Sequence, residues 1–330
     1  MSISTQHLPG EFLPYLERCP VLRLIGGTPV VKIEMEGLDK PGVEVYAKIE
    51  YFNPGGSIKD RPVLWMLLSS LVDGVWNKEQ AVLDSSSGNA GIAYAMIGKA
   101  LGYKVALVVP GNASVERKKR ILAHGAELRF TDPLEGYDEA LRTAHRLADD
   151  EPDKFFFCDQ YGNSANWKAH YYTTAAEILE QTDRKVTHFV GGVGTGGTIT
   201  GVGRRLKEEL PGTEITLVEP DAFPGIEGLK PLEGPDDIIP EIYDASVVDR
   251  KVPVSIDDAY EECQVLAKIG LFVGQSSGAY LRGVREVVKN IDKGVVVTVF
   301  SDFGERYFST GLWTVEEPPI PKGGRGSRRA

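Results

Sequence analysis

The sequence predicts an α/β protein built from two doubly wound, three-layer α/β domains. Short apolar runs alternate with helical patterns nearly throughout, and glycine- and serine-rich loops follow four of the predicted strands. A chain of 330 residues is long enough for two such domains. Because doubly wound sheets bind ligands outside the carboxyl ends of their strands, we expect the functional site between the domains.

The first half of the chain carries alternating strand and helix patterns. Strands are expected at 43–51, 81–84, 104–109, 127–130 and 154–158. Helices are expected directly after Lys59 and at 92–101, 114–124 and 137–149. In the first of these helices the spacing of Leu64, Leu67, Leu68 and Leu71 predicts one buried face. Ser114 suits a helix N-cap, and Gly102 and Gly125 suit the left-handed position that ends a helix.

The second half repeats the alternation. Strands are expected at 186–190, 214–218, 271–273 and 295–300, with a long connection over 220–240. We expect a smaller, mobile domain over 52–164 and a larger domain formed by 20–51 and 165–315. The last residues, 316–330, are expected to form a basic, flexible tail.

Composition excludes several classes of protein. The formal net charge of −10 argues against a general nucleic-acid or anionic-membrane surface, and no apolar run approaches the length of a membrane span. Three well-separated cysteines indicate a reducing compartment, and the histidines show no metal-binding spacing, so we expect no catalytic metal. Without a signal-peptide pattern at the N-terminus, the expected location is the cytoplasm.

The segment 53–61 (NPGGSIKDR) is the most informative feature of the chain. It places Lys59 immediately before a helix, at the positive end of its dipole and next to apolar surface, and both effects disfavour an ammonium. A lysine that tends toward its neutral amine is the kind that forms a Schiff base. A solvated lysine in a glycine-rich turn is an equally good interpretation of this loop alone.

Three further loops lie between predicted strands and helices. Residues 85–91 (SSSGNAG) offer hydroxyls, an amide and backbone N–H groups suited to a carboxylate. Residues 191–198 (GGVGTGGT) are glycine-rich enough for backbone N–H groups to close on a phosphate. Residues 274–279 (GQSSGA) by themselves indicate no more than a helix cap.

The glycine-rich loop at 191–198 also permits a different function. Gly192, Gly194 and Gly197 fit the dinucleotide fingerprint, and Glu219 ends the next strand about 20 residues later, as that fingerprint requires. On this loop alone a nicotinamide-dependent dehydrogenase is a fair prediction. It leaves Lys59 and the other loops without a role.

Taken together, the four loops resemble the cysteine synthase and cystathionine β-synthase family. These are pyridoxal-phosphate enzymes of fold type II, with a fold like that of the tryptophan synthase β subunit. The likeness runs from residues 25–29 (IGGTP) to about Trp313, and 115–117 (VER) and 159–163 (DQYGN) also resemble family segments. Four motifs in one order are far more specific than any one of them.

The resemblance implies a role for individual residues. Lys59 would hold pyridoxal phosphate as an internal aldimine and then act as the acid–base group at the substrate α-carbon. Asn89 would bond the cofactor's 3′-oxygen, and Ser276 would face the pyridine nitrogen. The cofactor phosphate would be bound by Gly194, Thr195, Gly196, Gly197 and Thr198. The substrate carboxylate would be held by Ser86, Ser87, Gly88, Asn89 and Gln160.

The reaction implied is β-replacement, in which O-acetylserine loses acetate to give an aminoacrylate, and sulfide adds to give L-cysteine. The alternatives are O-phosphoserine with a sulfur-carrier protein as donor, and cystathionine β-synthase-like chemistry. Asp221 stands after Glu219-Pro220, where the phosphoserine branch often has arginine, and Ala90 replaces the usual threonine. The family also implies a homodimer. A non-catalytic relative is a further alternative, against which Lys59, Asn89 and Ser276 count.

Overall fold

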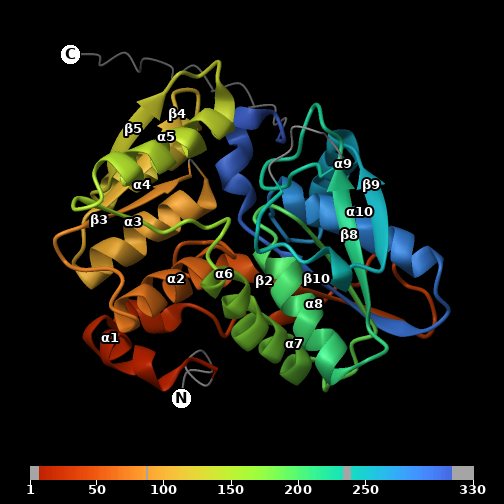
Figure 1. Ribbon diagram of the computed structural model, residues 1–330. Helices are drawn as coiled ribbons and strands as arrows, with labels where there is room; N and C mark the ends of the chain where they lie inside the picture. The colour runs from red at the N-terminus through yellow and green to blue at the C-terminus, as the bar shows by residue number, and fades with distance from the viewer. Residues whose placement is uncertain (1–6, 87, 233–238, 314–330) are drawn as a thin grey trace, which may run out of the picture.

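The computed structural model describes residues 7–86, 88–232 and 239–313, and its strands form two separate sheets. Figure 1 shows the smaller sheet with its helices beside the larger sheet with its own, so that the molecule has two lobes. The four-stranded sheet has the order β5-β4-β3-β6, and the six-stranded sheet has the order β1-β2-β10-β7-β8-β9. The predicted α/β fold with two doubly wound sheets is confirmed.

The smaller sheet is entirely parallel. Its strands are β5 (Glu127–Thr131), β4 (Val105–Pro110), β3 (Ala81–Ser85) and β6 (Phe155–Phe157). Its helices are α2 (Asp60–Val72), α3 (Asn89–Leu101), α4 (Val115–Ala123) and α5 (Gly136–Asp150). Successive residues of a strand point to opposite faces. Accordingly Val82 packs into the core that holds α2 and α3, whereas Leu83 packs with the buried alanines of α5. The result is three layers.

The larger sheet is parallel except for its first strand, β1, which pairs antiparallel with β2. Its strands are β1 (Val30–Lys32), β2 (Val43–Ile49), β10 (Gly294–Phe300), β7 (His188–Gly192), β8 (Glu214–Pro220) and β9 (Arg250–Val254). The helix α8 (Gly197–Glu209) joins β7 to β8, and α9 (Ile256–Lys268) and α10 (Gln275–Lys289) join β9 to β10. Right-handed crossovers that run in opposite directions along a sheet cover opposite faces, so this lobe also has three layers.

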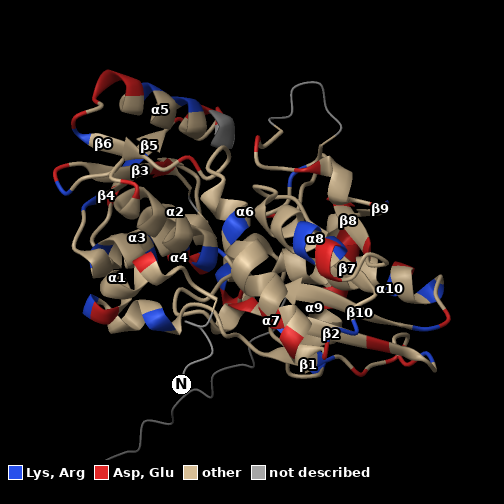
Figure 2. Cartoon of the chain, turned by 60° about the horizontal axis from the view of Figure 1, so that its bottom comes forward, with Lys and Arg blue, Asp and Glu red and all other residues tan. Residues whose placement is uncertain are grey.

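Shorter helices complete the described chain. They are α1 (Leu13–Arg18), α6 (Ala165–Ala169) and α7 (Ala175–Gln181), with a π-helical turn at His170–Thr174 between the last two. Short 3-10 helices lie at Gly10–Phe12, Pro20–Leu24, Glu50–Phe52, Ala245–Val247 and Gly304–Thr310. No helix in the described ranges is long and apolar enough to cross a membrane. On α5 and α8, acidic and basic residues are interspersed (Figure 2).

Most of the predicted elements are confirmed within a few residues, but three strands differ. The strand expected at 271–273 is wrong, because this segment makes only an isolated bridge between Val273 and Phe303, and β10 already has neighbours on both sides. The strands β1 and β9 were not predicted. The first has only three residues, and the second is an edge strand that carries Pro253, which weakens a strand signal.

Some expectations lie outside this comparison. The tail at 316–330 and part of the connection over 220–240 lie outside the described residues. The domain boundaries and the mobility of the smaller domain stay predictions.

The expected caps are confirmed: the Ser114 hydroxyl accepts the backbone N–H of Arg117, and Gly102 and Gly125 end helices with φ of +85° and +83°.

A buried ionic network joins the lobes at the N-terminal end of α2. The guanidinium of Arg61, only 1% exposed, binds both Glu50, at the end of β2, and Glu177 of α7, each at 2.7 Å. Glu177 also receives Lys48 of β2 at 2.7 Å. Burial acts to raise the pKa of Glu177, but the two cations outweigh it and hold that pKa well below its usual value.

We expect Glu177→Gln to destabilise the fold by about 3–5 kcal/mol, because it leaves the buried Arg61 and Lys48 undercompensated. The Glu177 contribution is fully present above the pKa of an unfolded glutamate, about 4.3, and is lost progressively as pH falls from there through the much lower folded-state pKa. Denaturant unfolding at pH 7 and at a series of pH values well below the unfolded-state pKa measures both effects.

The matched control is Glu286→Gln, which removes the half-buried partner of the exposed Lys289 on α10. It should change the free energy of unfolding little at any of these pH values. Equal losses for the two variants at pH 7 would contradict the role given to the Arg61 network.

Candidate active site

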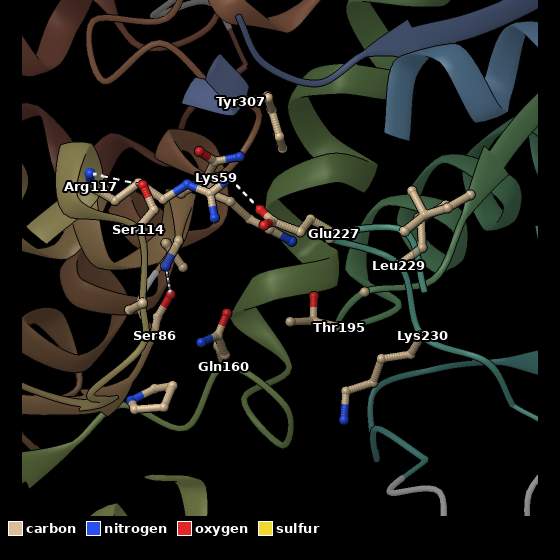
Figure 3. A pocket seen from close by; sticks show the side chains of 18 of the residues that line it. Lys59, Ser86, Ser114, Arg117, Gln160, Thr195, Glu227, Leu229, Lys230 and Tyr307 are labelled. Atoms are coloured by element: carbon tan, nitrogen blue, oxygen red, sulfur yellow. Dashed lines mark hydrogen bonds and ion pairs between the residues drawn. The ribbon is translucent and has the colours of Figure 1, made fainter. Parts of the chain in front are cut away.

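Two adjoining cavities lie between the lobes, at the carboxyl ends of both sheets. The larger has a volume of about 580 Å³ and is shown in Figure 3. The narrower one, about 40 Å³, shares Lys59, Asn89, Gly194 and Thr195 with it. Every described residue that the sequence analysis assigned to the site lines at least one of the two; Ser87 lies outside the described residues.

Lys59 stands where the two cavities meet. It is the N-cap residue of α2, and its backbone N–H donates to the Ser57 hydroxyl at 3.3 Å. A Cβ placed on Gly194 would lie 3.8 Å from the Lys59 Nζ, so the amine reaches the phosphate loop predicted from the sequence. Burial lowers the pKa of Lys59 to about 8, although the carboxylate of Asp302 opposes the shift. The predicted direction of the shift is confirmed, with desolvation as its main cause.

The glycine-rich loop before α8 has room for backbone only. A Cβ on Gly194 would lie 2.5 Å from the Gly228 carbonyl oxygen, and one on Gly197 would lie 2.0 Å from the Asn166 Oδ1. Gly196 adopts φ of +84°, which other residues avoid. The first N–H groups of α8 have no partner within the helix, and its dipole favours an anion there. The loop is therefore shaped as an anion cradle.

The hydroxyl of Ser276 lies in the narrow cavity, on the first turn of α10. Ser276 is buried, and within the described part of the chain no hydrogen bond to its hydroxyl is found. The neighbouring Gln275 instead bonds within the protein, accepting the backbone N–H of Glu227 at 3.0 Å. Ser276 is thus available for a ligand, and Gln275 holds the loop that carries Glu227.

The serine-rich loop before α3 is organised from beneath by Asp84. Its carboxylate accepts the hydroxyl of Tyr94 and the backbone N–H of Gln160, and burial raises the pKa of Asp84 to about 7. Gln160 donates from its side chain to the Ser85 carbonyl at 3.0 Å. The Ser86 hydroxyl accepts the N–H groups of Gly88 and Gly91, at 3.3 and 3.0 Å, so it caps the helix and keeps its own proton to donate.

Sequence reasoning missed a fifth segment of the site, residues 301–307. Asp302, Arg306 and Tyr307 follow the end of β10, where strand-end topology alone would have directed a search. Asp302 accepts the Asn89 side-chain amide at 2.7 Å and the Tyr307 hydroxyl at 2.8 Å. Arg306 donates to the side-chain Oδ1 of Asn89 and to the backbone carbonyl of Gly55. The segment therefore touches both the lysine loop and the serine-rich loop.

An ion pair crosses the mouth of the larger cavity, and it too was missed. Arg117 of α4 binds Glu227 of the other lobe at 2.5 Å. The Arg117 guanidinium also lies 5.1 Å from the centroid of the Tyr307 ring. Figure 3 shows these three side chains around Lys59. Asp221, in contrast, is exposed and is not among the residues that line either cavity.

Comparison with known proteins assigns the family. The model of the family described as "Pyridoxal-phosphate dependent enzyme" matches residues 21–302. The chain belongs to this family. It is 49% identical over 312 residues to a cysteine synthase of Aquifex aeolicus, covering 91% of this chain and 94% of that one.

Solved structures agree with this assignment. A cysteine synthase of Entamoeba histolytica aligns with a TM-score of 0.83 at 34% identity, covering 91% of this chain and 92% of the other. An O-ureido-L-serine synthase also aligns with a TM-score of 0.83 at 34% identity, covering 91% and 96%. The fold type II prediction is confirmed. The family assignment excludes the dehydrogenase interpretation of the glycine-rich loop; in the structure the acid of that fingerprint, Glu219, binds Lys251 at 2.6 Å.

The geometry fits pyridoxal phosphate, the cofactor of this family. A backbone cradle, a buried hydroxyl with no protein partner among the described residues and an amine of low pKa surround one narrow cavity. These groups suit a phosphate, a ring nitrogen and Schiff-base formation, respectively. Among the described residues, no group of histidine, cysteine and acidic side chains could hold a metal ion.

In protein freed of cofactor, the reactivity of the Lys59 amine should rise through about pH 8, because its ammonium loses its proton near that pH. Brief acetylation at a series of pH values, followed by peptide mass spectrometry, measures this. The internal control is Lys32, whose pKa is raised by its bonds to Glu44 and Glu34. Identical pH profiles for the two lysines would contradict the desolvation of Lys59.

Breaking the ion pair across the mouth should weaken substrate retention. We expect Glu227→Gln to raise the KM for the amino-acid substrate roughly fivefold, the equivalent of about 1 kcal/mol for a partly exposed pair, with a smaller change in kcat. Steady-state kinetics measure the split, with Glu286→Gln as the control. A fall in kcat at unchanged KM would show that the pair does not act by holding the cleft closed.

Proposed function

We propose that this protein makes L-cysteine by pyridoxal-phosphate-dependent β-replacement, with O-acetylserine as the activated serine and sulfide as the nucleophile. The observation that carries the proposal is the position of Lys59, an amine of low pKa between a phosphate cradle and a larger cavity. The cysteine synthases among its relatives support the reaction type.

The proposed cofactor contacts follow from the narrow cavity. Gly194, Thr195, Gly196, Gly197 and Thr198 would bind the phosphate, Ser276 the ring nitrogen and Asn89 the 3′-oxygen. When bound, pyridoxal phosphate supplies the electron sink that lets an amino acid lose its α-proton and its β-substituent. Ser276 presents a neutral hydroxyl, which supports a positive ring nitrogen less than a carboxylate would. A weaker sink favours prompt loss of the β-substituent over transamination or racemisation.

The α-carboxylate of the substrate would bind at the start of α3. Ser86, Asn89 and Gln160 line the larger cavity there. The donors would be backbone N–H groups of the first helical turn, the Ser86 hydroxyl and the second N–H of the Gln160 amide. Ser87, Gly88 and Asn89 belong to the same proposed subsite. Ala90 lines it with a methyl group.

Proton transfer is assigned to Lys59. With a pKa of about 8, a useful fraction of this amine is neutral near pH 7, so its Nζ can accept the α-proton of a substrate held at the α3 terminus. The Arg117–Glu227 pair would close the mouth over the substrate and exclude water, which would otherwise compete with sulfide.

O-phosphoserine is the second candidate substrate, and the lining of the larger cavity favours it. Arg117 and Lys230 both line that cavity, whereas Asp221, whose charge disfavours a phosphate, does not. Arg117 is neutralised by Glu227, so Lys230 is the cation that decides between the two donors. Cystathionine β-synthase-like use of a larger thiol is compatible with the cavity volume.

The assembly and location of the enzyme are further parts of this proposal. We propose a homodimer in the cytoplasm, on the strength of the family resemblance and of the cysteine pattern. Sulfide is the proposed sulfur donor, with a sulfur-carrier protein as the alternative. Size-exclusion chromatography with light scattering, and rates measured with each donor, test these points.

Lys59→Ala should abolish the visible absorption of the bound cofactor in its lysine-linked form and lower turnover by at least about 100- to 10,000-fold, because both the covalent link and the proton acceptor are lost. The control is Lys230→Ala, which removes a different cation from the lining of the larger cavity and should keep the absorption band. Wild-type turnover by Lys59→Ala would rule out the proposed mechanism.

The donor is identified by titrating the wild-type protein separately with O-acetylserine, O-phosphoserine and serine and following the visible spectrum. We expect O-acetylserine to change the spectrum at the lowest concentration and sulfide to restore it. A stronger response to O-phosphoserine that Lys230→Ala abolishes would assign the second candidate instead. No band after incubation with pyridoxal phosphate would exclude the whole proposal.

A further inference from the structure

The side-chain amide of Asn89 is held between two buried groups of opposite charge. Its Nδ2 donates to the Asp302 Oδ2 at 2.7 Å, and its Oδ1 accepts from the Arg306 guanidinium. Asp302 is 0% exposed and Arg306 is 7% exposed. Both bonds are charge-assisted, which makes them stronger than bonds between neutral groups.

This arrangement permits only one orientation of the amide. The two ends of an asparagine amide have nearly the same shape, so packing alone does not choose between them. If the amide of Asn89 turned over, its carbonyl oxygen would face the Asp302 carboxylate and its NH₂ group would face the Arg306 guanidinium. Each of the two buried charges would then lose its hydrogen bond to Asn89 and face a group of like polarity, which is costly where water cannot replace the lost bond.

The two charged groups are themselves fixed in place. Asp302 accepts the Tyr307 hydroxyl at 2.8 Å and, through its backbone carbonyl, the N–H of Gly274 at 3.1 Å. Arg306 donates to the Gly55 carbonyl, in the loop that carries Lys59. Of the two residues that hold the Asn89 amide, Arg306 is therefore bonded to the lysine loop and Asp302 to the loop before Ser276.

Fixing the amide leaves one donor for the site. An amide NH₂ group has two N–H bonds, and Asp302 takes one of them. Within the described residues no protein acceptor is found for the other, and Asn89 lines both cavities together with Lys59. A single orientation of Asn89 thus leaves an N–H donor, rather than a carbonyl oxygen, available to a ligand in the cavities.

We propose that Asp302 and Arg306 are positioning residues that lock the Asn89 amide in one orientation, so that its free N–H serves the 3′-oxygen of the cofactor. The inference rests on the proposed function and assigns to the segment 301–307 a role that the four sequence motifs do not cover. Arg306 and Asp302 act through Asn89 and are not catalytic residues.

The test compares two cofactors on full-length protein freed of cofactor: pyridoxal phosphate and its analogue without the 3′-oxygen. Fluorescence or absorbance titration gives a dissociation constant for each, and their ratio measures the preference for the 3′-oxygen. The wild type should prefer pyridoxal phosphate by about ten- to a hundredfold, the range of a hydrogen bond to a charged group. Asn89→Ala should abolish this preference.

Asp302→Ala should lose most of the preference, because the binding of pyridoxal phosphate should weaken relative to that of the analogue. Its effect on the pKa of Lys59 acts on both cofactors and cancels in the ratio of the two dissociation constants. Asp302→Asn can still accept one N–H from Asn89, so it should restore part of the preference. Arg306→Lys, which cannot hold both carbonyl oxygens with one planar group, should also reduce it and serves if Asp302→Ala does not fold.

Glu286→Gln is the control. It removes a carboxylate that pairs with Lys289 on α10 and lines neither cavity, so it should keep the wild-type preference. Equal losses for both cofactors in Asp302→Ala would overturn the proposal and assign Asp302 a purely structural role. Equal binding of both cofactors by the wild type would overturn it as well, because the 3′-oxygen would then have no contact with Asn89. Failure of the wild type to bind either cofactor would overturn the proposed function itself.

Discussion

The buried guanidinium of Arg61 is the constraint on which the position of the site depends. It lies two residues after Lys59 and joins α2 to Glu50 of the larger lobe and to Glu177 of α7. Glu177 also accepts the N–H of Gly27, and the Asn53 side chain accepts that of Gly26. The N-terminal glycine segment and the lysine loop are thereby held as one unit against the larger sheet. A lysine at the start of an isolated helix would not be fixed relative to the larger sheet in this way.

Two opposing effects set the pKa of Lys59, and both follow from its position between the lobes. Burial between two lobes lowers the pKa of the amine, whereas Asp302 raises it, and burial is the larger effect. The outcome, a pKa of about 8, leaves the group able both to form a covalent link and to exchange a proton near neutral pH. Asp302 therefore has two effects, on the charge of Lys59 and on the orientation of Asn89, and both arise because one carboxylate is buried where three loops meet.

The α/β class, the order of most elements and the four loops could be predicted from the sequence because each depends on local pattern. Alternation of apolar runs identifies buried parallel strands, and a dense run of glycines after one of them identifies an anion cradle. The prediction failed for two different reasons. The strand β9 was missed because Pro253 at a sheet edge weakens its local signal, whereas 271–273 was wrongly predicted because its strand-like composition has no free position beside β10.

The residue types of the site can be read from the chain, since Lys59, Asn89, Ser276 and the glycine loop are visible in short motifs. Which side chains control them depends on how the two lobes pack. Asp302 meets Asn89 across 213 positions of the chain, and Arg117 meets Glu227 from the opposite lobe. No local pattern encodes such pairs, because they exist only when the carboxyl ends of two separate sheets face each other. Burial and charge pairing are properties of the assembled cleft, whereas motifs report only the conformation of neighbouring residues.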